Sequence, residues 1–199
     1  PSNRVKPYPF MATRYLQLQH DNKQGATSGD GRGLWNGILK HKGQTWDISS
    51  RGTGVTSLAP GAVKADAPLQ TGNEQHGYGC GLAEIDELYS STLMSEILHN
   101  NGYKTERMLV IIEHSGGYGI GVRAGKNLFR PAHLFTHLKQ NNHAALIAAT
   151  DFLLDRQINN SEWDISTTSK NKYSTMLDAI VNDFAEFTAY LERDYIFAW

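Results

Sequence analysis

The alternation of apolar and polar positions predicts four short strands in the front part of the chain. Residues 34–40 and 45–50 are two strand candidates, and the polar turn between them predicts a hairpin. Residues 108–113 are apolar and rich in β-branched side chains, which indicates a buried strand. Residues 118–123 follow across a Ser-Gly-Gly turn, so we expect these two strands to pair.

Helical spacing begins between the two strand pairs and dominates the back part of the chain. Apolar positions within 85–97 recur at i, i+3, i+4 and i+7, and Asn100-Asn101-Gly102 supplies a stop because glycine tolerates the left-handed position after a helix. After Arg130-Pro131 the pattern stays helical, and the apolar stripes within 144–154 and 173–191 predict two helices.

Because the strands come first and the helices afterwards, the sequence predicts an α+β fold. We expect a sheet lobe over residues 1–129 and the beginning of a helical lobe over 130–199, with a ligand in the cleft between the lobes. The apolar run 195–199 resembles a core element interrupted in mid-course, and the chain begins with Pro1. We therefore expect the chain to be truncated at both ends.

Composition narrows the class of protein. A net charge of −1 gives no electrostatic reason to expect nucleic acid or an anionic membrane as a partner. The one cysteine, Cys80, cannot form an internal disulfide, so nothing indicates an oxidising compartment. No signal peptide is visible, and no apolar run reaches the roughly 18 residues that a membrane helix needs. We expect a cytoplasmic protein without a membrane partner.

A glycine-rich segment precedes the first predicted strand. Bare glycine backbone lets N–H groups approach phosphate oxygens, and the arginine beside them adds positive charge. An ordinary turn is the alternative, because Gly and Asp are common in turns. The residues concerned are Gly29, Asp30, Gly31 and Arg32. A second glycine-rich stretch, 52–81, is long enough to be a functional or disordered loop.

Three further arginines are candidates for binding an anion. Arg51 ends a strand that follows a hairpin, where kinase-like nucleotide sites place a cation, normally lysine. Arg123 and Arg130 are seven residues apart across an expected strand-to-helix bend, and both could bind one phosphate through their planar guanidinium groups. The alternative for each is an unrelated, solvated surface charge.

The histidines do not have the spacing of a metal site. His133 and His137 are four residues apart and could share a helix face, but no nearby carboxylate or histidine completes a ligand set. The sequence therefore predicts no metal ligand in this chain.

Taken in order, these segments resemble the selenoprotein O (SelO, YdiU-like) family. The family pattern has a GDGR loop, a WDxxxKGxGxTP-type segment, a helix with SEAM, a PTTRAL-type strand and RVAPSxLRFG. This chain has Gly29 to Arg32 (GDGR), WDISSRGTGVT at 46–56, LMSEIL at 93–98, KTERML at 104–109 and RAGKNLFR at 123–130. The resemblance covers roughly residues 25–199.

The resemblance implies a protein-kinase-like fold and a specific activity. The activity is transfer of AMP from ATP, with Mg²⁺, to hydroxyl groups of Ser, Thr or Tyr on a protein substrate. By position, Gly29, Gly31 and Arg32 would line the nucleotide and Gly81 would contact it. Arg123 and Arg130 would hold the outermost phosphate, and Arg51 takes the place of the family's strand lysine.

The sequence also departs from the family pattern. Arg51 keeps the charge of the lysine but not its compact ammonium group. The helix glutamate that should pair with that lysine falls on Ser91, and Glu87, one turn earlier, is the substitute that we expect. Cys80 stands where the family has an aspartate.

These departures leave two hypotheses open. The chain is the front portion of an adenylyltransferase, with the catalytic base and the Mg²⁺ ligands expected beyond Trp199, or it is a non-catalytic nucleotide-binding protein or scaffold on the same fold. In the first case we expect this chain alone to be inactive, because phosphoryl and nucleotidyl transfer need metal ions and a group that positions the nucleophile.

Overall fold

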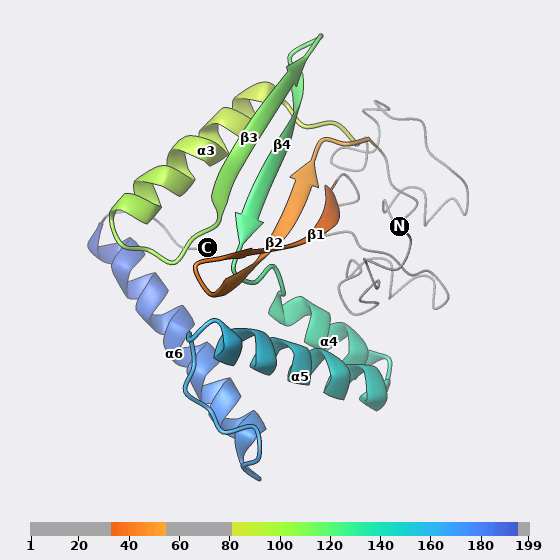
Figure 1. Ribbon diagram of the computed structural model, residues 1–199, viewed down its shortest axis with the longest axis vertical. Coiled ribbons are helices and arrows are strands. Elements are labelled where there is room, and N and C mark those ends of the chain that lie inside the picture. Colours follow the sequence, from red (N-terminus) through yellow and green to blue (C-terminus); the bar gives the residue numbers. More distant parts are fainter. Residues whose placement is uncertain (1–32, 55–80, 195–199) are drawn as a thin grey trace.

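The computed structural model of the protein describes residues 33–54 and 81–194. This part is an α+β structure with one four-stranded antiparallel sheet, in the order β1-β2-β4-β3, and four helices. The sheet and α3 form one part and the helices α4, α5 and α6 form the other, as Figure 1 shows. The predicted fold class is therefore confirmed at the level of α+β.

Both predicted hairpins are present in the sheet. β1 (Gly33–His41) and β2 (Gln44–Arg51) are joined by Lys42 and Gly43, which have φ values of 49° and 78°. Two positive φ values are what a two-residue hairpin turn requires if the strands are to keep their twist. β3 (Arg107–His114) and β4 (Tyr118–Gly125) form the second hairpin, and β4 also pairs with β2.

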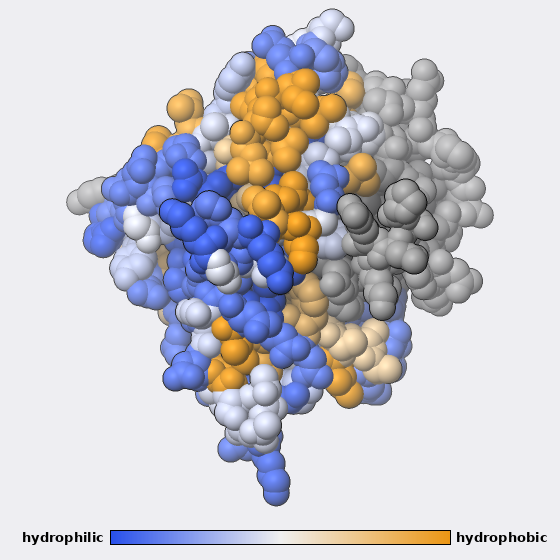
Figure 2. Space-filling model, viewed as in Figure 1, coloured by the Kyte–Doolittle hydropathy of each residue, from blue (hydrophilic) through white to orange (hydrophobic). Residues whose placement is uncertain are grey.

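The expectation that 108–113 is a buried strand is wrong. Among the described strands, β3 lies at the edge of the sheet and pairs with β4 alone. Leu109, Val110 and Ile112 are 52%, 46% and 52% exposed. Figure 2 shows an apolar band on the surface where β3 lies in Figure 1. An apolar sequence predicts a strand, but burial depends on what packs against it, and that information is not local.

Helix α3 (Ile85–Asn100) lies against one face of β3 and β4. Glycine permits this close approach, since a Cβ atom at Gly121 would lie 2.7 Å from Cδ2 of Leu88. Leu88 is buried, whereas Leu93 and Ile97 of the predicted apolar stripe are 65% and 49% exposed. The helix predicted for 85–97 is thus confirmed, but the sheet covers only part of its apolar face.

The second part consists of α4 (Pro131–Lys139), α5 (His143–Asn159) and α6 (Lys172–Arg193). The apolar stripes predicted α5 and α6, but α4 had not been distinguished within the helical region. The helices share a core with the linker after β4 and with β1. Its buried members are Trp35, Phe129, Ala149, Leu153, Leu154, Ile165 and Met176.

A buried carboxylate joins the sheet to the helices. Asp47 on β2 is 0% exposed and forms an ion pair of 3.0 Å with Arg156 of α5. It also accepts hydrogen bonds from Trp35 Nε1 at 3.2 Å and from the Leu128 amide at 3.1 Å. A buried charge is tolerated only when it is neutralised and hydrogen-bonded, so Asp47 fixes how these elements meet.

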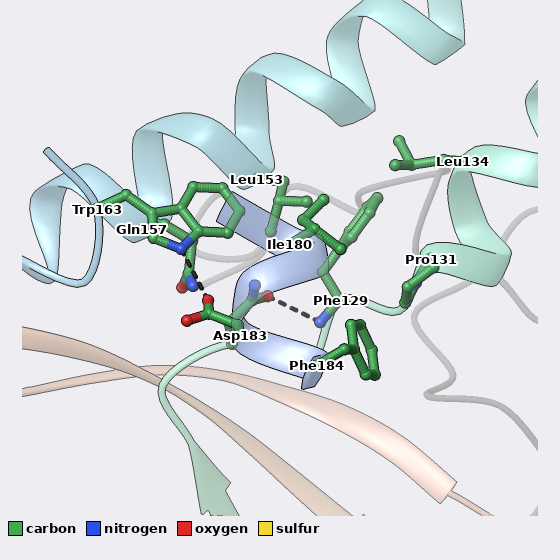
Figure 3. A pocket seen from close by; sticks show the side chains of 10 residues that line it. Phe129, Pro131, Leu134, Leu153, Gln157, Trp163, Ile180, Asp183 and Phe184 are labelled. Carbon is green, nitrogen blue, oxygen red and sulfur yellow. Dashed lines mark hydrogen bonds between the residues drawn. The ribbon is translucent and has the colours of Figure 1, made fainter. Parts of the chain in front are cut away.

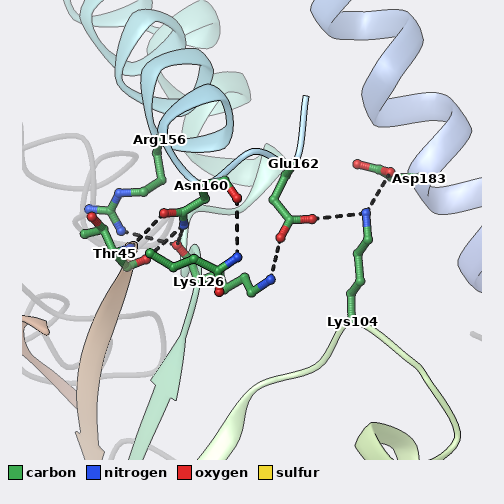
Figure 4. A network of polar contacts seen from close by, with 8 residues as sticks. Thr45, Lys104, Lys126, Arg156, Asn160, Glu162 and Asp183 are labelled. Carbon is green, nitrogen blue, oxygen red and sulfur yellow. Dashed lines mark hydrogen bonds and ion pairs between the residues drawn. The ribbon is translucent and has the colours of Figure 1, made fainter. Parts of the chain in front are cut away.

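Asn160, at the end of α5, adds a second connection (Figure 4). Its Oδ1 accepts from the Thr45 amide at 2.8 Å, and its Nδ2 donates to the carbonyls of Thr45 and Lys126. Lys126 in turn binds Glu162 at 2.6 Å. Three backbone groups that the sheet leaves unpaired are satisfied in this way, which couples β2 and the β4–α4 linker to α5.

Candidate functional site

The structure describes half of the predicted site residues. The glycine-rich segment, Gly29, Asp30, Gly31 and Arg32, lies outside the described residues. The site residues that can be located are Arg51, Gly81, Arg123 and Arg130.

Arg51, the last residue of β2, forms an ion pair with Glu87 in the first turn of α3. Its Nη1 lies 2.8 Å from Oε1 of the glutamate, and both side chains are partly buried. Next to Arg51 the backbone passes close to β4, because a Cβ atom at Gly52 would lie 2.2 Å from the carbonyl oxygen of Gly119. The sequence had indicated Glu87 as the partner of Arg51, and this pairing is confirmed.

Arg51 and Arg123 lie on the same face of the sheet. In the antiparallel register of β2 and β4, Arg51 is opposite Gly121 and Ser49 is opposite Arg123. Side chains alternate between faces along a strand, so the two arginines are diagonal neighbours, and such positions are about 7–8 Å apart. The sheet therefore brings two of the predicted cations together on the face that α3 partly covers.

Arg123 is already bound to a carboxylate. Its Nη1 donates to both oxygens of Glu106, at 3.0 and 2.7 Å. The arginine side chain is 10% exposed and the glutamate side chain 30%. Sequence reasoning missed Glu106, since the contact depends on the register that places Met108 opposite Arg123. No spacing rule joins positions 106 and 123.

A third arginine–glutamate pair lies beside these two. Arg107 uses Nε and Nη2 to bind both oxygens of Glu96 on α3, each at 2.8 Å. The hydrogen bonds from Arg107 hold the pKa of Glu96 below its usual value. The sheet edge near α3 is thus a set of matched charges rather than an open positive patch.

Gly81 and Arg130 do not lie on β2 or β4, the strands that carry Arg51 and Arg123. Gly81 is buried, and its carbonyl accepts a hydrogen bond of 3.0 Å from the Gly54 amide, which joins the two ends of the 55–80 segment. Arg130 is exposed in the linker between β4 and α4, so it does not belong to the strand face that Arg51 and Arg123 share.

A small cavity of about 140 Å³ lies between α4, α5 and α6 (Figure 3). Apolar side chains form most of its wall, and Asp183 at its rim accepts a hydrogen bond of 2.9 Å from Trp163 Nε1. The lining residues are Asn127, Phe129, Pro131, Leu134, Leu153, Gln157, Trp163, Ile180, Asp183 and Phe184. None of the predicted site residues is among them.

Metal-binding side chains do not cluster in residues 33–54 and 81–194, where no group of three or more His, Cys, Asp or Glu could hold an ion. His137 of α4 is buried, and burial lowers its pKa. The side chain of His133 lies outside what the structure describes. Within the described helices, none is both long and apolar enough to cross a membrane.

Comparison with known proteins adds no further assignment. No protein-family model matches the chain, and no curated protein matches it significantly.

Proposed function

We propose that this chain is the nucleotide-binding front portion of an ATP-dependent protein adenylyltransferase, which transfers AMP to hydroxyl side chains of proteins. The observation that carries the proposal is the Arg51–Glu87 ion pair of 2.8 Å between a central strand and α3. In protein kinases a strand lysine is held in the same way by a glutamate on the helix that follows, and this pair must form for the nucleotide phosphates to be bound correctly.

The order of the elements supports a protein-kinase-like arrangement. β2, which carries Arg51, lies between β1 and β4 in the sheet, and α3 separates the two hairpins in the sequence. Between β4 and residue 194 the regular elements are all helices. A cation at the end of a central strand, paired with a glutamate of a helix that lies against the sheet, supports the assignment of Arg51 to a kinase-like phosphate site.

We assign Arg51 and Arg123 to the phosphates of ATP and leave Arg130 and the glycine-rich segment as further predictions. Guanidinium groups suit this task because their N–H donors match phosphate oxygens in a planar fork. We expect the Mg²⁺ that accompanies ATP to be held by residues other than these, and we expect the protein substrate to supply a hydroxyl group.

Binding is tested first on the chain itself. We expect Mg²⁺-ATP to raise the free energy of unfolding by about 2.7 kcal/mol when its concentration is roughly 100 times Kd. Arg51→Gln should weaken binding by roughly tenfold to a hundredfold, which corresponds to losing one charge-assisted contact. Arg107→Gln is the matched control, since Arg107 pairs with Glu96 instead. Equal losses in both variants would argue against a phosphate site at Arg51.

The reaction is tested with labelled ATP and the full gene product. Transfer of label from the α-phosphate to protein, with none from the γ-phosphate, is the expected result. Transfer from the γ-phosphate alone would indicate a kinase instead, and no transfer of either label would contradict the adenylyltransferase proposal.

A second candidate is a nucleotide-binding protein without catalysis. The observation that favours it is the engagement of Arg123 by Glu106, combined with arginine in place of the strand lysine at position 51. This candidate predicts stabilisation by ATP with no transfer of either label.

A further inference from the structure

The guanidinium group of Arg123 is buried but only partly satisfied. Both of its hydrogen bonds to Glu106 come from Nη1. Its Nε is buried and has no acceptor within the part of the chain that the structure describes. A buried charged donor without a partner is unfavourable, so this nitrogen is a position where an acceptor would be stabilising.

The neighbouring Arg107 shows what a satisfied guanidinium looks like in the same sheet. Arg107 binds Glu96 through Nε and Nη2, one oxygen on each nitrogen. This two-point fork is the strong geometry for a carboxylate or a phosphate. Glu106 instead binds a single nitrogen of Arg123, Nη1, and Nε is left without an acceptor among the described residues.

Glu106 is also the more accessible partner of its pair. Its side chain is 30% exposed, against 10% for Arg123, and it precedes β3 rather than lying within the sheet. A carboxylate at the edge of the strand can rotate into water at little cost, whereas the arginine is held between β2 and β3. A phosphate at Arg123 is repelled by this carboxylate while it stays, because two anions would then share one cation.

We propose that Glu106 is a built-in competitor of the nucleotide at Arg123. In the nucleotide-free protein the carboxylate neutralises the guanidinium, and a nucleotide polyphosphate displaces it and accepts a hydrogen bond from Nε. This inference rests on the proposed function, since it concerns the same phosphate site. It adds that affinity for ATP is set in part by how tightly position 106 holds Arg123.

Calorimetric titration of the chain with Mg²⁺-ATP, and separately with inorganic pyrophosphate, tests the proposal. Glu106→Gln removes the competing charge and should lower Kd for both ligands by about tenfold. Glu96→Gln is the matched control, because it removes one negative charge from the neighbouring pair without touching Arg123. We expect its Kd to stay within about twofold of the wild-type value.

The double variant Glu106→Gln, Arg123→Gln separates competition from a general charge effect. Loss of the gain in the double variant supports the proposal, because the gain then depends on Arg123. A gain that persists there, or that Glu96→Gln reproduces, overturns it. Should Glu106→Gln fail to fold, as judged by its thermal transition, Glu106→Thr takes its place with the same expected results.

The outcomes also distinguish this inference from the proposed function. If the wild-type chain binds ATP and Glu106→Gln binds it equally well, Glu106 is not a competitor, while the proposed function stands. If neither protein binds ATP or pyrophosphate, the proposed function fails and this inference fails with it.

Discussion

Two buried arginines, Arg156 and Arg123, are 7% and 8% exposed, yet their surroundings differ. Arg156 pairs with Asp47, an acid that is fully buried and bound by two further donors. Arg123 pairs with Glu106, an acid that reaches solvent, and its Nε has no acceptor among the described residues. The first arrangement is complete and joins two parts of the fold. The second arrangement leaves a buried donor, Nε of Arg123, without an acceptor among the described residues, and we therefore propose that Arg123 binds a ligand.

The largest effect is expected for Arg156→Met. The variant leaves the buried Asp47 carboxyl without its counter-charge, and breaking a buried pair in this way costs about 3–5 kcal/mol. Urea denaturation measures the loss. Arg193→Met is the control, since the side chain of Arg193 is 59% exposed and its removal should have little effect. If Arg156→Met lowers the free energy of unfolding by less than about 1 kcal/mol, the Asp47–Arg156 ion pair does not hold the sheet and the helices together.

Asn160→Ala tests the same contact between the sheet and α5 through uncharged hydrogen-bonding groups. Asn160 is 1% exposed. Without its side chain, the amide and carbonyl of Thr45 and the carbonyl of Lys126 lose a hydrogen-bond partner. We expect a loss of about 2–3 kcal/mol in the same denaturation experiment. Asn159 is exposed and adjacent, so Asn159→Ala should change stability by less than about 0.5 kcal/mol. Similar values for both variants would count against the connection.

Arg123→Met should lower the free energy of unfolding far less than Arg156→Met does. This difference tests directly whether the two buried arginines have different roles. Glu106 can turn to solvent, and the substitution also removes a buried donor that has no partner among the described residues. We expect a loss of at most about 1 kcal/mol in the urea midpoint analysis. If the loss equals that of Arg156→Met, Arg123 belongs to the structural framework and not to a ligand site.

The smallest expected effect is the dependence of stability on pH that Glu162 contributes. Burial raises the pKa of Glu162, but hydrogen bonds from Lys126 and Lys104 outweigh it and leave the pKa below the ordinary value of 4.5. A lowered pKa means that the folded state binds its proton less readily than the unfolded state. The stabilisation is therefore complete above pH 4.5 and is lost as the pH falls through the lower folded-state value. As the pH falls below 4.5, the melting temperature of the wild-type protein should fall more steeply than that of Glu162→Gln. Identical pH dependence would contradict a contribution from this network.

The sequence was informative wherever local pattern determines structure. The two hairpins and three of the helices follow from alternation, turn residues and helical spacing. The expectation that Glu87 pairs with Arg51 came from the family resemblance, because Glu87 lies one helical turn before the position of the family's glutamate. It could not predict that β3 lies at an edge, because exposure depends on which strands and helices pack beside it.

The partners of buried charges were also beyond the reach of local pattern. Asp47 was noted as part of a motif, but its contact with Arg156 joins positions far apart in the chain. Asn160 contacts Thr45 on a strand far earlier in the chain, and Glu106 had no distinguishing neighbour. Such contacts are set by strand register and helix docking, and neither leaves a trace in composition or spacing.

The most direct test observes the Nε–H group of Arg123 by nuclear magnetic resonance during titration with Mg²⁺-ATP. Loss of one resonance in Arg123→Lys assigns the signal. If Arg123 binds the nucleotide phosphates, this resonance shifts with ATP and with pyrophosphate but not with adenosine. A resonance that stays unchanged while ATP is shown to bind elsewhere would contradict a phosphate site on this face of the sheet.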